Sequence, residues 1–149
     1  MADVTTKITT DIISVDDLFK NRDKYLVFDT RSPKEYDESH IPGAISCPLL
    51  DNIERHVVGI CYKQEGHDKA TKLGYEFFFK KFDDFCSQIL EFKRKTVVIQ
   101  CARGGMRSRI VVDLFQNKNR ILETIKRVGA EIDLKEFEKR LNKLDKINI

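Results

Sequence analysis

Two apolar runs of strand length constrain the fold of this chain most strongly. They are "YLVFDT" at 25–30 and "TVVIQ" at 96–100. A continuous run of this kind predicts a strand that is covered on both faces, as in a parallel sheet, because a half-exposed strand alternates apolar and polar residues. Helical patterns follow both runs, with Pro33 in a first turn at 32–39 and apolar periodicity at 108–116. The alternation predicts an α/β domain with a mainly parallel central sheet flanked by helices.

Weaker patterns complete the predicted order of elements. Ser14 is a candidate N-cap for a helix at 14–20, and apolar spacing of three and four predicts that 51–92 is mostly helical. Further strands are predicted at 7–10, 44–49 and 123–128, and a last helix at 133–144. Because the chain has 149 residues, no repeat and no Pro/Gly/Ser-rich linker, residues 1–149 are predicted to form a single domain.

Charge and cysteine spacing exclude several classes of protein. The net charge is +3, from 27 Lys and Arg against 24 Asp and Glu, which is too small to indicate a nucleic-acid binder on bulk electrostatics. There is no long apolar run and no signal-peptide pattern at the N-terminus, so we expect a cytoplasmic protein without a membrane partner. The four cysteines include no C-x-x-C pair, so we expect no metal site. Nothing in the sequence predicts a permanently bound cofactor.

The segment "CARGGMRS" at 101–108 is the strongest candidate for a site. Cys101 directly follows a predicted strand, and the loops at the carboxyl ends of parallel strands build the sites of α/β folds. A glycine-rich turn can aim backbone N–H groups at an anion, while nearby arginines and the start of a helix lower the pKa of a thiol. We therefore predict that Cys101 is the nucleophile. The predicted anion-binding residues are Ala102, Arg103, Gly104, Gly105, Met106, Arg107 and Ser108. The alternative is a small core cysteine that precedes an ordinary turn.

An earlier segment resembles the first signature of rhodanese domains. In "LVFDTRSPKEYDESHIPGAISCPL" at 26–49, an Asp and an Arg follow a strand, Glu-Tyr lies on a helix, and "HIPGA" comes next. The resemblance covers about residues 7–116 and implies a rhodanese-like fold with Cys101 as the active-site cysteine. We expect Asp29, Arg31, Glu35 and His40 of this segment to support the site structurally, by hydrogen bonds or ion pairs, rather than to react.

Two motifs resemble one subgroup, the tRNA 2-selenouridine synthases. The loop "CARGGMRS" is similar to the subgroup's Cys-x-Arg-Gly-Gly-x-Arg-Ser, and "VGICYKQEG" at 58–66 is similar to its Val-Gly-x-Cys-Tyr-Lys-Gln-x-Gly. The resemblance implies replacement of sulfur by selenium at C2 of a thiolated wobble uridine in tRNA, with selenophosphate as donor. In this family the reaction passes through an S-geranylated intermediate. Cys61, Lys63 and Gln64 are possible auxiliary residues: Cys61 as a resolving thiol or a helix residue, Lys63 and Gln64 as donor or tRNA contacts or as a solvated face.

The sequence also departs from this subgroup. Full-length members carry a second domain with a phosphate-binding loop, whereas these 149 residues contain no G-x-x-x-x-G-K-[ST] motif. The subgroup's Glu-Gly-Gly-Tyr corresponds only to "RVGAEI" at 127–132. The resemblance therefore implies a split enzyme, in which a separate phosphate-loop subunit completes the synthase and makes most of the contacts to tRNA.

Three rival functions are also compatible with these residues. A generic sulfurtransferase would move sulfane sulfur from thiosulfate or a persulfide through the same thiolate. The Cys-x5-Arg spacing from Cys101 to Arg107 also matches phosphatases and arsenate reductases, in which the arginine clamps a tetrahedral anion. Gln100 before the cysteine, where such enzymes have a histidine, and the "CYKQ" segment favour the synthase. The third rival is a binding module in which Cys101 has no chemical role.

Overall fold

The computed structural model describes residues 14–91, 96–100 and 106–145. Its described strands form one three-stranded sheet in the order β2-β1-β3, with β1 at Tyr25–Asp29, β2 at Ile45–Ser46 and β3 at Thr96–Gln100. Both pairings are parallel, as predicted, and β1 and β3 run in register from Tyr25 opposite Thr96 to Asp29 opposite Gln100. The predicted strand at 44–49 is therefore shorter, and the predicted strand at 7–10 lies outside the described residues.

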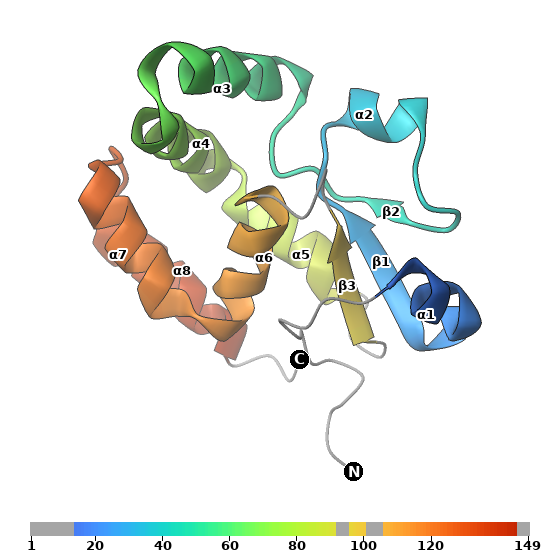
Figure 1. The fold of residues 1–149 in the computed structure, drawn as a ribbon. Helices are drawn as coiled ribbons and strands as arrows, with labels where there is room; N and C mark the ends of the chain where they lie inside the picture. Colours follow the sequence, from blue (N-terminus) through green and yellow to red (C-terminus); the bar gives the residue numbers. More distant parts are fainter. Residues whose placement is uncertain (1–13, 92–95, 101–105, 146–149) are drawn as a thin grey trace.

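Helices occupy most of the remaining described chain. α1 begins at Val15 after the predicted cap, since the Ser14 side chain accepts a hydrogen bond from the Asp17 N–H. The region predicted to be mostly helical contains three helices, and Figure 1 shows the helices from α3 onward gathered on one side of the sheet. The bounds are α1 Val15–Lys20, η2 Arg22–Lys24, α2 Pro33–Glu38, α3 Asn52–Glu65, α4 His67–Lys80, α5 Phe82–Leu90, α6 Met106–Gln116, α7 Lys118–Val128 and α8 Leu134–Asp145.

The central strand β1 is covered on both faces, as its apolar sequence predicts. Val27 packs with Leu18 of α1 and Ala44 in a small cluster on one face. Phe28, the next residue, points to the other face because successive side chains of a strand alternate. There it joins the large cluster formed by α4 to α8, in which Phe78 and other aromatic side chains are buried. Two layers of helices therefore hold β1 and fix where its carboxyl end lies.

The prediction of a last strand at 123–128 is wrong, because these residues lie in α7. Ile121 and Ile125 are four residues apart and both are buried against the core, which is the spacing of one helix face. The Asn117 side chain accepts a hydrogen bond from the Arg120 N–H and caps the start of the helix. Gly129 ends it in the left-handed conformation, at φ +72°. Both end signals favour a helix at 118–128 over the strand that was predicted at 123–128.

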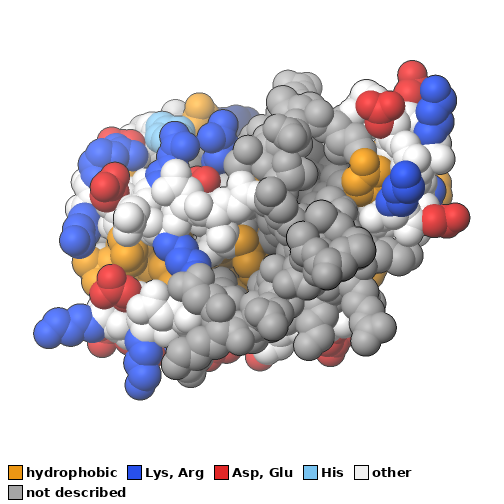
Figure 2. Space-filling model, turned by 90° about the horizontal axis from the view of Figure 1, so that it is seen from below, with side chains coloured by type: hydrophobic (Ala, Val, Ile, Leu, Met, Phe, Trp, Pro, Cys, Tyr) orange, Lys and Arg blue, Asp and Glu red, His pale blue; other side chains and the backbone are white. Residues whose placement is uncertain are grey.

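The described residues on the face shown in Figure 2 carry charges of both signs. Lys and Arg side chains are scattered there among Asp and Glu side chains. This distribution agrees with the small net charge of +3. Within the described ranges, no helix has both the length and the apolar character needed to cross a membrane.

Candidate functional site

The predicted nucleophile follows the last residue of β3. Gln100 ends β3 opposite Asp29, so the chain leaves the sheet at the carboxyl ends of two neighbouring parallel strands. Residues 101–105, which include Cys101, Ala102, Arg103, Gly104 and Gly105, lie outside the described residues. The chain continues at Met106, the first residue of α6. This strand-loop-helix order is where α/β folds place their sites.

The helix after this loop begins two residues earlier than predicted. The helical pattern predicts a start at Ser108, whereas α6 begins at Met106. Ser108 therefore lies inside the first turn rather than at its cap. Arg107 is the second residue of α6, and its side chain is described and only 16% exposed.

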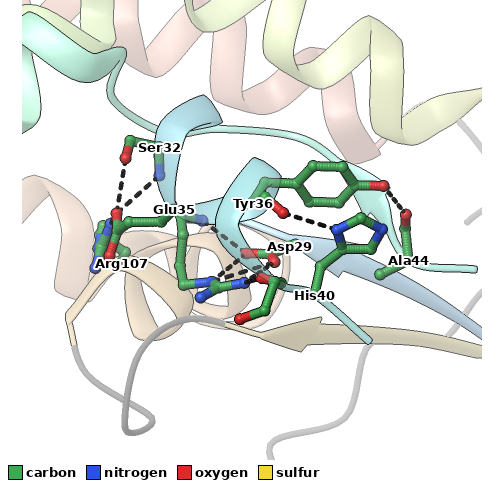
Figure 3. A network of polar contacts seen from close by, with 9 residues as sticks. Asp29, Ser32, Glu35, Tyr36, His40, Ala44 and Arg107 are labelled. Carbon is green, nitrogen blue, oxygen red and sulfur yellow. Dashed lines mark hydrogen bonds and ion pairs between the residues drawn. The ribbon is translucent and has the colours of Figure 1, made fainter. Parts of the chain in front are cut away.

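Arg107 forms an ion pair with Glu35 of α2, far away in the sequence. Arg107 Nη1 donates to Glu35 Oε1 at 2.7 Å, and Nη2 donates to Oε2 at 3.3 Å. Figure 3 shows the two side chains facing each other beside Ser32. Glu35 Oε1 also accepts hydrogen bonds from the Ser32 N–H at 3.0 Å and the Ser32 hydroxyl at 2.8 Å. One carboxylate therefore ties the start of α2 to the start of α6.

These contacts keep Glu35 ionised. Burial alone would raise its pKa, but the hydrogen bonds from Arg107 and Ser32 outweigh burial and lower the pKa from 4.5 to about 2. Arg55 of α3 approaches the same carboxylate, with Nε 3.8 Å from Oε1. Two arginines from different helices therefore lie against one negative charge.

A second ion pair fixes the chain just after β1. The Asp29 side chain is fully buried, and Arg31 Nη2 donates to its Oδ2 at 2.7 Å. The Arg31 N–H also donates to Asp29 Oδ1 at 3.0 Å, and Arg31 Nη2 donates to the Ser39 carbonyl at 2.7 Å. These bonds join the carboxyl end of β1 to the end of α2, which is a positioning arrangement.

His40 and Tyr36 anchor the turn between α2 and β2. The two rings stack with centroids 3.7 Å apart and planes 4° apart, and His40 Nδ1 lies 2.7 Å from the Tyr36 carbonyl oxygen. The Tyr36 hydroxyl donates to the carbonyl of buried Ala44 at 2.6 Å (Figure 3). Tyr36 is a supporting residue that the sequence analysis did not single out, although it lies in the segment that resembles rhodanese domains.

The three possible auxiliary residues all lie on α3. Lys63 and Gln64 are exposed, and Cys61 is partly exposed. Burial raises the pKa of the Cys61 thiol, and the hydrogen bond to Glu65, with Sγ 3.6 Å from Oε2, raises it further. A raised pKa disfavours the thiolate that a resolving cysteine needs. The position of Cys61 relative to Cys101 lies outside what the structure describes.

An apolar cavity of about 100 Å³ lies beside Arg107. α3 contributes Val58 and Tyr62 to its wall, α6 contributes Arg107 and Ile110, and α4 contributes Gly74 among others. Arg107 contributes an apolar part of its side chain to this wall, while its guanidinium faces Glu35. A small apolar group can be taken up here next to the start of α6.

Among the described residues, no group of three or more His, Cys, Asp and Glu side chains could hold a metal ion. What these residues offer chemically is a partly buried, hydrogen-bonded set of charges at the carboxyl edge of a parallel sheet, next to an apolar cavity. This arrangement defines an α/β domain with linked charged side chains at the carboxyl edge of its parallel sheet.

The chain belongs to the family of proteins with a rhodanese-like domain, since the model of that family matches residues 14–129. Domains of this family are typically sulfurtransferases. A solved structure, the N-terminal domain of a putative ATP/GTP binding protein from Clostridium difficile 630, is 38% identical to this chain with a TM-score of 0.65. The match covers 70% of this chain and 81% of the clostridial one.

Proposed function

We propose that this chain is the rhodanese component of a split tRNA 2-selenouridine synthase. In this function, Cys101 handles selenium that is derived from selenophosphate, and sulfur is replaced by selenium in the wobble 2-thiouridine of tRNA. The loop 101–108 binds the anionic donor. This proposal goes one step beyond the sulfurtransferase-type function that is typical of the family.

One observation carries the proposal: the two motifs that resemble the synthases meet at one cavity. Val58 and Tyr62 belong to "VGICYKQEG", and Arg107 belongs to "CARGGMRS". Val58 and Tyr62 lie on α3 and Arg107 lies on α6, yet all three residues line the same cavity. Because generic rhodanese domains lack the first motif, this meeting supports the subgroup rather than only the family.

The chemistry of the cavity agrees with the proposed reaction. The exchange at C2 is redox-neutral, because a carbon–selenium bond replaces a carbon–sulfur bond and both chalcogens stay at the same oxidation level. An S-geranylated intermediate carries an apolar chain next to the reacting sulfur. The apolar cavity beside Arg107 supports this route, because its volume of about 100 Å³ offers a few carbons of such a chain a place away from water.

We further propose that a separate phosphate-loop protein completes the enzyme and makes most of the contacts to tRNA. The small net charge of +3 supports a limited role of this chain in tRNA binding. The clostridial relative is described as the N-terminal domain of a putative ATP/GTP binding protein, which supports a functional link to a nucleotide-binding part.

Reconstitution tests this function. Thiolated tRNA is incubated with selenophosphate, geranyl diphosphate, this chain and a candidate phosphate-loop protein, and 2-selenouridine is measured by nucleoside mass spectrometry. We expect product only with both proteins, and none with Cys101→Ser. Product from this chain alone would contradict the split enzyme. Thiosulfate-dependent sulfur transfer without selenouridine would favour a generic sulfurtransferase, and Cys101-dependent hydrolysis of a phosphate ester would favour a phosphatase.

A further inference from the structure

We propose that the cavity beside Arg107 binds the end of an aliphatic chain, of about five carbons, and that Gly74 of α4 limits how long this end can be. An apolar cavity of about 150 Å³ holds benzene, so a volume of about 100 Å³ suits fewer carbons than benzene has. The inference rests on the proposed function, because it specifies which part of an apolar chain next to the reacting sulfur this protein takes up. It makes Gly74 a specificity-determining residue.

The cavity lies between α3 and α4, which pack side by side (Figure 1). Ala70, Gly74 and Phe78 are spaced by four residues, so they share one face of α4, and all three line the cavity. Val58 and Tyr62 line it from α3 with the same spacing. Large side chains at all these positions would fill the space between the helices, whereas Ala70 and Gly74 leave it open.

Gly74 is the point at which the cavity wall lacks a side chain. It lies in the interior of α4, where glycine is less stable than alanine because it has more backbone freedom to lose. A Cβ added at Gly74 would meet no atom within 4 Å, so it would extend into the cavity without a clash. Protein interiors are close-packed, so an empty space of this size also lowers stability. A ligand that fills the space next to Gly74 explains both costs.

The polar groups of two wall residues are engaged outside the cavity. The Thr71 hydroxyl donates to the His67 carbonyl of its own helix at 2.8 Å. The guanidinium of Arg107 faces Glu35. An ordered water needs several polar partners, which these two residues do not direct into the cavity, whereas an aliphatic group gains free energy by leaving water. The chemistry of the wall therefore favours an aliphatic ligand.

The wall of the cavity extends from the core to the surface, so a chain can enter with its end first. Leu49 and Phe78 in the wall are 3% and 1% exposed, whereas Tyr62 is 55% exposed. The end of the chain can lie among the buried residues while the rest of the molecule leaves past Tyr62. Because the space ends in the core, carbons beyond about the fifth gain no further burial there. The cavity therefore predicts a limit of chain length.

NMR titration of the full, isotope-labelled protein with linear primary alcohols, from propan-1-ol to octan-1-ol, tests the inference. We expect chemical-shift changes at Gly74, Val58 and Ile110, which line the cavity from three helices. The affinity should rise about fourfold with each added carbon up to about pentan-1-ol and then level off, because each buried CH₂ group contributes equally until the space is full.

Gly74→Ala should lower this limit. The added methyl group fills part of the cavity, so we expect the affinity to level off about one carbon earlier and pentan-1-ol to bind about fourfold more weakly than in the unchanged protein. Lys80→Ala is the matched control, because it changes an exposed position of the same helix, and it should bind all alcohols like the unchanged protein. Ile110→Ala enlarges the cavity from α6 and should move the limit to longer alcohols.

Three results would overturn the inference: an affinity that rises steadily to octan-1-ol, chemical-shift changes away from the cavity wall, or an unchanged limit in Gly74→Ala. The titration needs no selenium, tRNA or partner, so its result is separate from that of the reconstitution. A limit of chain length without 2-selenouridine in the reconstitution would uphold the cavity as a binding site and contradict the proposed function.

Discussion

Glu35 shows how one side chain can link two parts of a site that the sequence separates by 72 positions. The sequence predicts Glu35 as a supporting residue and Arg107 as an anion-binding residue, each from its own motif. It does not predict that they contact each other, because a single sequence does not show which distant positions vary together. The contact changes how Arg107 is understood, since its guanidinium already has an anionic partner.

Glu35 should contribute to stability in a defined range of pH. Because its pKa is lowered from 4.5 to about 2 in the folded chain, its contribution is complete above about pH 4.5 and is lost as the pH falls toward 2. We expect the free energy of unfolding of the unchanged protein to exceed that of Glu35→Gln at neutral pH, and the difference to vanish over this range. Denaturant titrations at several pH values measure it. A difference that does not change with pH would contradict the ionised pair.

Tyr36 should matter for folding through its hydroxyl group. Tyr36→Phe leaves the ring stacked on His40 but removes the 2.6 Å hydrogen bond to the carbonyl of buried Ala44. Because a buried acceptor is then left without this donor, we expect a loss of about 1–3 kcal/mol in the free energy of unfolding. Chemical denaturation measures this loss. His40→Ala offers a comparison, since it removes the stacking and keeps the hydroxyl; an unchanged stability of Tyr36→Phe would show that the bond is unimportant.

At the scale of elements, the sequence predicts strands best when they are buried on both faces, because such strands are continuous apolar runs. β1 and β3 lie within the predicted segments for this reason, and α2 lies within the predicted helix at 32–39 with Pro33 in its first turn. The segment 123–128 fails because six residues are too few to distinguish alternation from a helix face. Asn117 and Gly129 at the two ends carried the missing information.

The end of α7 gives a prediction at this scale. Gly129 has φ +72° with no atom within 4 Å of an added Cβ, so Gly129→Ala adds backbone strain without a clash. We expect a loss of about 1 kcal/mol in the free energy of unfolding. Gly74→Ala is the matched control, because Gly74 lies inside α4 with equally open space and should gain about 0.5–1 kcal/mol. Thermal or denaturant unfolding compares both; a stabilising Gly129→Ala would contradict the left-handed end of α7.

At the scale of the whole molecule, β3 ends at Gln100 at the carboxyl edge of the sheet, one residue before the predicted nucleophile. The sequence predicts this place because the glycines, arginines and cysteine are contiguous. The cavity could not be predicted in the same way, since its wall combines α3, α4 and α6, which only the packing of the core brings together. The fold therefore adds to the resemblance of the two motifs, because it brings residues of both to one cavity.

We propose that this rhodanese-like chain uses Cys101 to replace sulfur by selenium in tRNA together with a phosphate-loop partner. The measurement that tests it most directly is the amount of 2-selenouridine, determined by nucleoside mass spectrometry in the reconstituted reaction. We expect 2-selenouridine when the unchanged chain and the partner are both present, and none when Cys101→Ser replaces the unchanged chain. Equal amounts with Cys101→Ser, or full formation by this chain without any partner, would contradict the account.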